Sequence, residues 1–289
     1  MARNDKRWWH TVIDAHQHFW RYNDEEFSWI TPAMVVLSRD FEPADLQREM
    51  TAAGVEGAIS VQARTCLEET HYLLQAAAGN DFILGVVGWV DLKSPAVDAD
   101  LDRYANHPKF KGVREICQGA PDHRFFTDPA FNAGIRALTK RGLVYDLLIF
   151  ANQLPAAAAF VDLHPHQKFV LDHCAKPAIR GSEPSEDWRH QLSELAQRPN
   201  VACKISGLVT ELCHPASNWN LELLRPYFET VLDAFGPDRV MVGSDWPVLN
   251  VRASYGGWVG VLHEWLAEYP RAVSHAIASE TARRLYGCS

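Results

Sequence analysis

Two histidines with one residue between them follow a short apolar run near the N-terminus, within residues 12–20. In an extended strand alternate side chains share a face, so His16 and His18 should point the same way, with Asp14 behind them. Two imidazoles that converge at one strand end can bind a metal ion or polarise a carbonyl group. Two histidines satisfied by backbone partners would give the same pattern, so the later apolar runs must decide the interpretation.

Polar and titratable residues also stand at the ends of the later apolar runs. They are Arg114, Glu115 and Gln118 for the fourth run, Tyr145 and Asp146 for the fifth, His173 and Lys176 for the sixth, Lys204 and Ser206 for the seventh, and Ser244 and Asp245 for the eighth. Packing alone does not favour this arrangement, because each buried charge is costly unless it is paired or used. An N-cap role would also explain Asp245, and a hydrogen-bonded core position would also explain His173. An internal ion pair would account for Lys204 and Asp146 as well as catalysis would.

Eight apolar runs of strand length alternate with helical segments along the 289 residues. The predicted strands are 12–20, 57–63, 82–91, 110–116, 143–150, 168–173, 201–206 and 240–245. The predicted helices are 45–54, 68–78, 97–105, 129–141, 153–163, 188–197, 221–235, 258–268 and 275–285. This alternation predicts one (β/α)8 TIM barrel domain over residues 1–289, with 1–10 as a flexible N-terminal extension. An open doubly wound sheet is the alternative, but the sequence has no Gly-rich phosphate motif.

In such a barrel the C-terminal ends of the strands carry the chemistry, so the polar residues at the run ends should meet there. The connection 20–44 contains several aromatic residues, and a long aromatic loop beside a polar site either covers it or packs against the core.

The overall composition excludes several classes of partner. The net charge of −8 and the absence of any Lys/Arg-rich run argue against nucleic acid. No stretch reaches transmembrane length, and the charged first residues lead into Trp8 and Trp9 instead of the apolar region of a secretory signal. Six scattered cysteines without a C-x-x-C pair indicate reduced thiols. We therefore expect a cytoplasmic enzyme that is a monomer or a small homo-oligomer.

The run-end motifs resemble those of the amidohydrolase superfamily. Its pattern is His-x-His after the first strand, a histidine after the sixth and an aspartate after the eighth. More narrowly, residues 13–20, 112–114, 171–177, 203–208 and 243–247 are similar to those of the sugar-lactone hydrolases in that superfamily, the group that includes L-fuconolactonase. The resemblance covers nearly the whole chain. It implies hydrolysis of a sugar-acid lactone such as an L-fuconolactone-like aldonolactone.

The resemblance also implies roles for individual residues. Asp245 would activate water, Arg114 would contact substrate oxygens, and His16, His18 and His173 would surround the carbonyl group. This sequence differs from the superfamily pattern at two positions that affect the predicted site. Binuclear members use a histidine on the fifth strand, where this chain has Tyr145-Asp146, so we do not expect a two-metal site. Several relatives have histidine at the position of Glu115, and the change could alter substrate preference or supply a metal ligand.

Lactone opening needs a base for water, an electrophilic contact for the carbonyl oxygen and a proton for the departing alkoxide. We expect Asp245 to be the base and His173 to orient the water or protonate the leaving oxygen. Arg114, with His16 and His18, would stabilise the oxyanion, either directly or through one zinc ion held by His16, His18 and Asp245. Because a lactone is strained and reactive, no metal is required. The expected substrate-binding residues are Arg114, Glu115, Gln118, Lys204 and Trp29.

Three other functions fit the same residues. A metal-dependent decarboxylase would use similar ligands on a carboxylated aromatic substrate, and it would lose all activity on chelation. A hydrolase of a muconolactone or another dicarboxylate-derived lactone would keep the mechanism and change the substrate. A non-catalytic sugar-acid binding protein would not need the full set of acid, base and cation at the strand ends.

Overall fold

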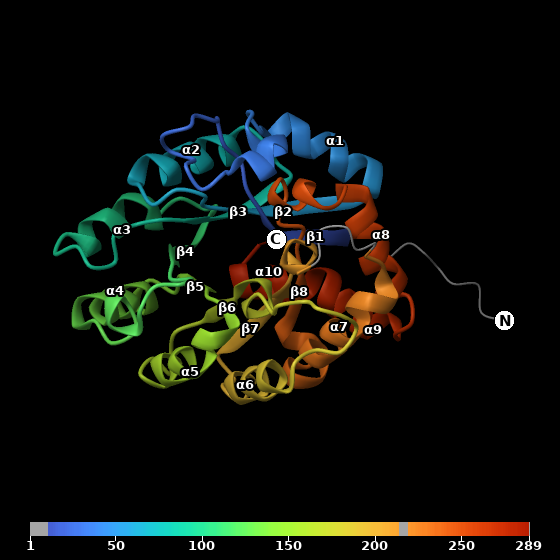
Figure 1. Ribbon diagram of the computed structural model, residues 1–289. Helices are drawn as coiled ribbons and strands as arrows, with labels where there is room; N and C mark the ends of the chain where they lie inside the picture. Colours follow the sequence, from blue (N-terminus) through green and yellow to red (C-terminus); the bar gives the residue numbers. More distant parts are fainter. Residues whose placement is uncertain (1–10, 214–218, 289) are drawn as a thin grey trace.

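The computed structural model describes residues 11–213 and 219–288, and the predicted extension 1–10 lies outside these ranges (Figure 1). Within them the chain forms eight parallel strands whose spatial order is their order in the sequence. The strands are β1 Val12–Gln17, β2 Val55–Val61, β3 Ile83–Gly88, β4 Phe110–Ile116, β5 Val144–Leu148, β6 Phe169–Leu171, β7 Val201–Ile205 and β8 Val240–Val242. The predicted TIM barrel is thereby confirmed.

Just beyond β8 the backbone joins the first strand and brings the two ends of the sheet together. The amide of Asp245 donates to the His16 carbonyl at 2.8 Å, and the amide of His18 donates to the Trp246 carbonyl at 2.7 Å. Both bonds lie at the C-terminal end of β1, where the sequence predicted the site. The closure therefore places Asp245 against the two histidines.

Helices follow the strands and surround the barrel (Figure 1). They are α1 Pro43–Ala53, α2 Leu67–Ala78, α3 Val97–Ala105, α4 Pro129–Lys140, α5 Leu154–Asp162, α6 Glu186–Ala196, α7 Leu221–Phe235, α8 Tyr255–Leu266, α9 Arg271–His275 and α10 Thr281–Tyr286. At the N-termini of several helices a side chain accepts hydrogen bonds from the first backbone amides; examples are Asp128 at α4 and Asn220 at α7. None of the helices in the described ranges is long and apolar enough to cross a membrane.

The segment 275–285 is helical throughout, as predicted, but it is not a regular α-helix. The chain forms α9, then a π-helical turn over Ala276–Glu280, and then α10. A π turn inserts one residue into the helical repeat, and periodicity averaged along a segment does not detect it. The predicted loop 20–44 also contains a 3-10 helix, Pro32–Leu37.

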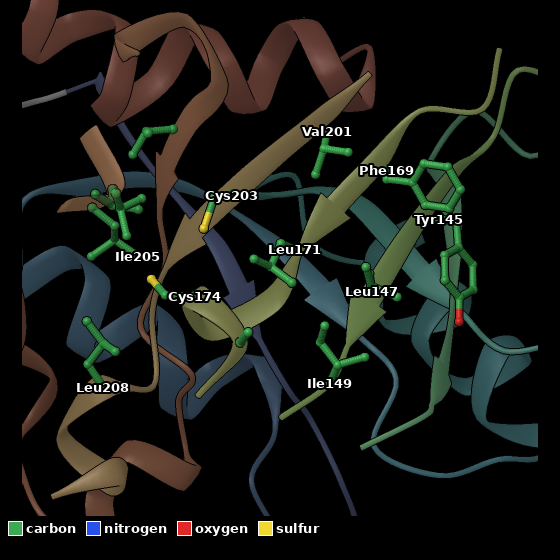
Figure 2. Packing of buried hydrophobic residues seen from close by; sticks show 14 of the residues in the cluster. Tyr145, Leu147, Ile149, Phe169, Leu171, Cys174, Val201, Cys203, Ile205 and Leu208 are labelled. Atoms are coloured by element: carbon green, nitrogen blue, oxygen red, sulfur yellow. The ribbon is translucent and has the colours of Figure 1, made fainter. Parts of the chain in front are cut away.

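The core has two layers separated by the strands. Figure 2 shows the outer layer, formed by alternate residues such as Tyr145 and Leu147 on β5, Phe169 and Leu171 on β6, and Val201, Cys203 and Ile205 on β7. The intervening residues Val144, Val170 and Ala202 belong to a separate inner cluster. Ala282 and Tyr286 of α10 belong to this inner cluster, so the C-terminal helix closes the barrel floor. The same alternation turns Asp146 and Lys204 into the barrel.

Candidate active site

A cavity of about 400 Å³ opens at the C-terminal ends of the strands. Six of the predicted site residues line it: His18, Trp29, Arg114, Gln118, His173 and Asp245. Trp20, Trp29 and Met34 come from the long aromatic connection, so this connection forms part of the cavity wall as well as part of the core. A larger hollow of about 670 Å³ lies between α2 and α3 on the outside of the barrel, away from the strand ends, and we assign the chemistry to the smaller one.

The structure brings the four predicted catalytic side chains together at the base of this cavity. His16 Nε2 lies 3.2 Å from His18 Nε2, and His18 Nε2 lies 3.3 Å from Asp245 Oδ1. The distances from Asp245 Oδ1 to His16 Nε2 and to His173 Nε2 are 3.8 and 3.9 Å. All four residues are buried. One carboxylate oxygen therefore faces three imidazole nitrogens.

The second nitrogen of each ring is held by the protein, and for two rings this determines the tautomer. His16 Nδ1 lies 3.2 Å from Asp172 Oδ1, and His18 Nδ1 lies 2.8 Å from the Val61 carbonyl. The Val61 carbonyl can only accept, so His18 Nδ1 donates. His16 Nδ1 also lies 3.2 Å from the Lys204 ammonium, but the Arg114 guanidinium can only donate to His16 Nε2, so in the neutral ring Nδ1 carries the proton and donates to Asp172. When these imidazoles are neutral, their Nε2 lone pairs face each other and Asp245. Such a centre attracts a proton, a water hydrogen or a cation.

Burial determines the charge state of the centre. It lowers the pKa of His16 well below the ordinary value, and it lowers the pKa of His173 to about 4 even though Asp245 opposes the shift. For Asp245 burial would raise the pKa, but the surrounding imidazoles, His173 foremost, hold it below the usual range. At neutral pH the centre therefore combines the neutral imidazoles of His16 and His173 with an ionised Asp245 carboxylate.

This donor set fits one divalent metal ion. Atoms of His16, His173 and Asp245 lie within 4.8 Å of one another, and His18 Nε2 adjoins them. Zinc prefers neutral imidazole and ionised carboxylate ligands, and His16, His173 and Asp245 are in these states at neutral pH. The Arg114 guanidinium competes for the same centre, because its Nη1 lies 3.2 Å from His16 Nε2.

Two cavity residues carry buried polar atoms that have no hydrogen-bond partner within the described residues. Arg114 is held by Asp172 Oδ2 at 3.2 Å and by the carbonyl of Gln62, but its Nε is unpaired. Gln118 Oε1 is also unpaired. Because an unpaired buried polar atom is costly, a hydrogen bond from a bound ligand to either atom would be favourable.

Two predicted substrate-binding residues do not reach the cavity. Lys204 lies inside the barrel, where its fully buried Nζ contacts Asp146 Oδ2 at 2.5 Å and Asp172 Oδ1 at 3.0 Å. The alternative explanation, an internal ion pair, is therefore the arrangement that the structure contains. Glu115 follows the inward-facing Arg114 and points the other way, and it accepts a hydrogen bond from Trp89 Nε1 at 2.8 Å.

Asp14 differs from its expected position. The pairing of β1 with β2 shifts register between Asp14 and Gln17, so Asp14 and His16 do not share a face. The Asp14 carboxylate instead accepts from Ser244 Oγ at 2.6 Å, the Ser244 amide at 2.8 Å and Tyr255 Oη at 3.1 Å. Burial raises its pKa to about 6. Asp14 therefore connects β1 to the segment that carries Asp245.

A glycine is required beside the centre. Gly207 follows β7 with φ +65°, and a Cβ atom there would lie 2.7 Å from His173 Nδ1 and 3.1 Å from Asp245 Oδ2. Both the backbone conformation and the space exclude a side chain. Sequence reasoning also missed Asp172, although it directly precedes His173 in the predicted sixth strand.

The comparisons with known proteins agree with this geometry. A family model described as amidohydrolase matches residues 13–288. This chain belongs to the amidohydrolase family. The amidohydrolase is 38% identical to an L-fucono-1,5-lactonase of Burkholderia ambifaria over 95% of this chain and 92% of the relative. It is 39% identical to an L-fucono-1,5-lactonase of Burkholderia multivorans over 95% of each chain.

A solved structure has the same fold as this chain. The crystal structure of an amidohydrolase from Burkholderia multivorans with bound zinc is 38% identical and superimposes with a TM-score of 0.91, covering 96% of this chain and 99% of the other. The zinc in that relative and the donor set described above are both consistent with the expectation of at most one metal ion.

Proposed function

We propose that this amidohydrolase opens a sugar-acid lactone of the L-fucono-1,5-lactone kind to the free acid. The observation that carries the proposal is the convergence of the Asp245 carboxylate, three imidazole nitrogens and the Arg114 guanidinium at one cavity of about 400 Å³. The two lactonase relatives support the choice of substrate class.

In the proposed reaction Asp245 accepts a proton from water while the water oxygen attacks the lactone carbonyl carbon. Arg114 donates to the carbonyl oxygen as negative charge develops there. The ring C–O bond then breaks, and the departing ring oxygen receives the proton that Asp245 took from water, passed on by the neighbouring His173 imidazole. A zinc ion held by His16, His18, His173 and Asp245 would polarise the carbonyl group and lower the pKa of the attacking water.

A panel of aldonic-acid lactones with a pH indicator tests the proposal, because each ring opening releases a proton. We expect turnover of a 6-deoxy or six-carbon aldonolactone, and we expect it to survive a chelator because Arg114 already places a positive charge at the centre. Loss of turnover that zinc restores would make His16, His18 and Asp245 required ligands. Activity restricted to an aromatic carboxylate or a muconolactone would overturn the substrate class.

The pH dependence of kcat/KM follows from the lowered pKa of His173. Its imidazole is neutral above about pH 4, and protonation below that value places a positive charge beside Asp245, which weakens that carboxylate as a base. We expect kcat/KM, corrected for spontaneous lactone opening, to stay level between about pH 8 and about pH 5 and to fall at lower pH. An acid limb centred near 6.5 would mean that the ring titrates as it does in water.

We further infer a cytoplasmic enzyme that works as a monomer or a small homo-oligomer. The six cysteines are free thiols, which supports a reducing compartment. The closed barrel supplies a complete core within one chain. Sedimentation of the purified protein would determine the oligomeric state.

A further inference from the structure

One side of the cavity contains a charged pair that the proposed reaction does not use. Lys176, after β6, and Glu211, after β7, both line the cavity. Lys176 Nζ lies 3.8 Å from Glu211 Oε1, and the two side chains are only 19% and 20% exposed. At this distance the charges attract each other without a direct hydrogen bond, so both groups keep hydrogen-bonding capacity for a ligand.

An unusual backbone conformation presents Lys176 to the cavity. His173, Cys174, Ala175 and Lys176 have φ angles of 53°, 54°, 59° and 52°, so they form one left-handed turn without a glycine. Each such residue costs about 1–2 kcal/mol, and a turn of this kind persists only where the surroundings hold it. Trp188 Nε1 donates to the Cys174 carbonyl at 2.9 Å and holds it. The turn directs both His173 and Lys176 at the cavity.

The backbone also connects the two segments that carry the pair. The amide of Ile179 donates to the Glu211 carbonyl at 3.0 Å, and the amide of Cys213 donates to the Ile179 carbonyl at 2.9 Å. The loop after β6 and the loop after β7 therefore form one unit. Lys176 and Glu211 are held in position before a substrate arrives, which limits the entropy cost of binding.

The two sides of the cavity differ in chemistry. The loops after β4, β6 and β7 contribute Gln118, Lys176 and Glu211, and Gln118 Oε1 is an unpaired acceptor. The connection after β1 contributes the apolar surfaces of Trp29 and Met34. Ile116 and Leu148, at the ends of β4 and β5, also line the cavity, so the polar groups stand among apolar surfaces. A lactone ring that places its hydroxyls at Gln118, Lys176 and Glu211 and its apolar exocyclic carbon against Trp29 or Met34 matches this lining.

The charges in the cavity are balanced. Arg114 and Lys176 are cations, and Asp245 and Glu211 are anions. A lactone that carried an additional carboxylate would find no spare cation, and on the polar side its charge would lie close to Glu211. Burial raises the pKa of Glu211, Lys176 opposes this shift, and Asp245 adds to it. In its ionised form beside Lys176, Glu211 repels anionic substituents and accepts hydrogen bonds from hydroxyl groups.

We propose that Lys176 and Glu211 determine substrate specificity: together they bind the hydroxyl groups of a neutral lactone, and Glu211 excludes lactones that carry a carboxylate. This inference rests on the proposed lactonase function and adds a substrate class to it. A hydroxyl between the two groups would accept a hydrogen bond from the ammonium and donate one to the carboxylate.

The test compares two substrates on four proteins. The substrates are a neutral 6-deoxy-aldonolactone and an aldaric-acid monolactone, which bears a free carboxylate. The proteins are the unchanged enzyme, Glu211→Gln, Lys176→Met and the control Glu264→Gln, which replaces an exposed glutamate on α8. For the neutral lactone we expect Glu211→Gln and Lys176→Met to lower kcat/KM by about tenfold or more, mainly through KM, because each removes a hydrogen bond to a charged group.

The ratio of kcat/KM for the neutral lactone to that for the anionic lactone is the decisive quantity. Glu211→Gln should lower this ratio by about tenfold or more, since it removes the repulsion and leaves a neutral, weaker acceptor for the hydroxyl group. Glu264→Gln should leave it unchanged. A Glu211→Gln protein with normal thermal unfolding and an unchanged ratio overturns this inference alone. Absence of turnover by the unchanged enzyme on every lactone overturns the proposed function and this inference with it.

Discussion

Asp245→Asn lowers kcat for lactone opening by about 10²- to 10⁴-fold, the contribution of a positioned general base. The amide keeps the shape of the side chain and loses the ability to take a proton from water. Asp245 is the carboxylate that faces His16, His18 and His173 at 3.3–3.9 Å, and the imidazoles keep it ionised over the working pH range. Initial rates on an aldonolactone, with circular dichroism as a check of the fold, measure the effect.

A matched control separates catalysis from a general loss of charge. Asp233→Asn changes an exposed aspartate on α7 and should leave kcat within a factor of two. A folded Asp245→Asn protein with nearly normal kcat would remove Asp245 as the base and leave an imidazole as the remaining candidate.

Lys204→Met lowers the free energy of unfolding by about 3–5 kcal/mol, the usual cost of breaking a buried ion pair by removal of one partner. The Lys204 ammonium lies inside the barrel at 2.5 Å from Asp146 and 3.0 Å from Asp172, and all three side chains are fully buried. Without the ammonium, two carboxylates remain in the barrel, and Arg114 is the cation that still pairs with Asp172. Urea unfolding followed by tryptophan fluorescence measures the change.

Two further variants make this prediction specific. Lys168→Met changes an exposed lysine just before β6 and should alter the free energy of unfolding by less than about 0.5 kcal/mol. Lys204→Met combined with Asp146→Leu should recover part of the loss, because it removes the unpaired carboxylate together with its cation. Equal stability of Lys204→Met and Lys168→Met would show that the barrel accommodates the two carboxylates without the ammonium.

The Lys204 network also connects the barrel floor to the catalytic centre. Tyr286 of α10 donates to Asp146 at 2.8 Å, Asp146 pairs with Lys204, and Asp172 lies between Lys204 and His16. A loss of the ammonium should therefore disturb the orientation of His16 as well as the stability.

Much of the site was predictable because of a general property of parallel barrels. His16, His18, His173 and Asp245 lie far apart in the chain, yet each stands at the end of an apolar run. Parallel strands in a closed sheet bring such ends to one face, so run-end position was enough to bring these four residues together. Arg114 and Gln118 followed from the same reasoning and line the same cavity.

The position of a residue within a strand was harder to predict. Asp146 and Lys204 lie one layer below the cavity, and Glu115 points outward, although each stands near the end of an apolar run. Apolar periodicity locates a strand to within a few residues, but a shift of one residue exchanges the inner and outer faces. The register irregularity at Asp14 has the same consequence, and no local signal in the sequence marks it.

The order of apolar and amphipathic segments therefore determined the barrel, its catalytic face and the identity of the four central residues. These depend on burial and periodicity, which are local properties of the chain. The charge state of the centre, the internal pairing of Lys204 and the position of Glu211 beside Lys176 depend on groups that are distant in sequence. Desolvation and ion pairing act through space, so these features were established only when the closed barrel brought the groups within a few ångströms of one another.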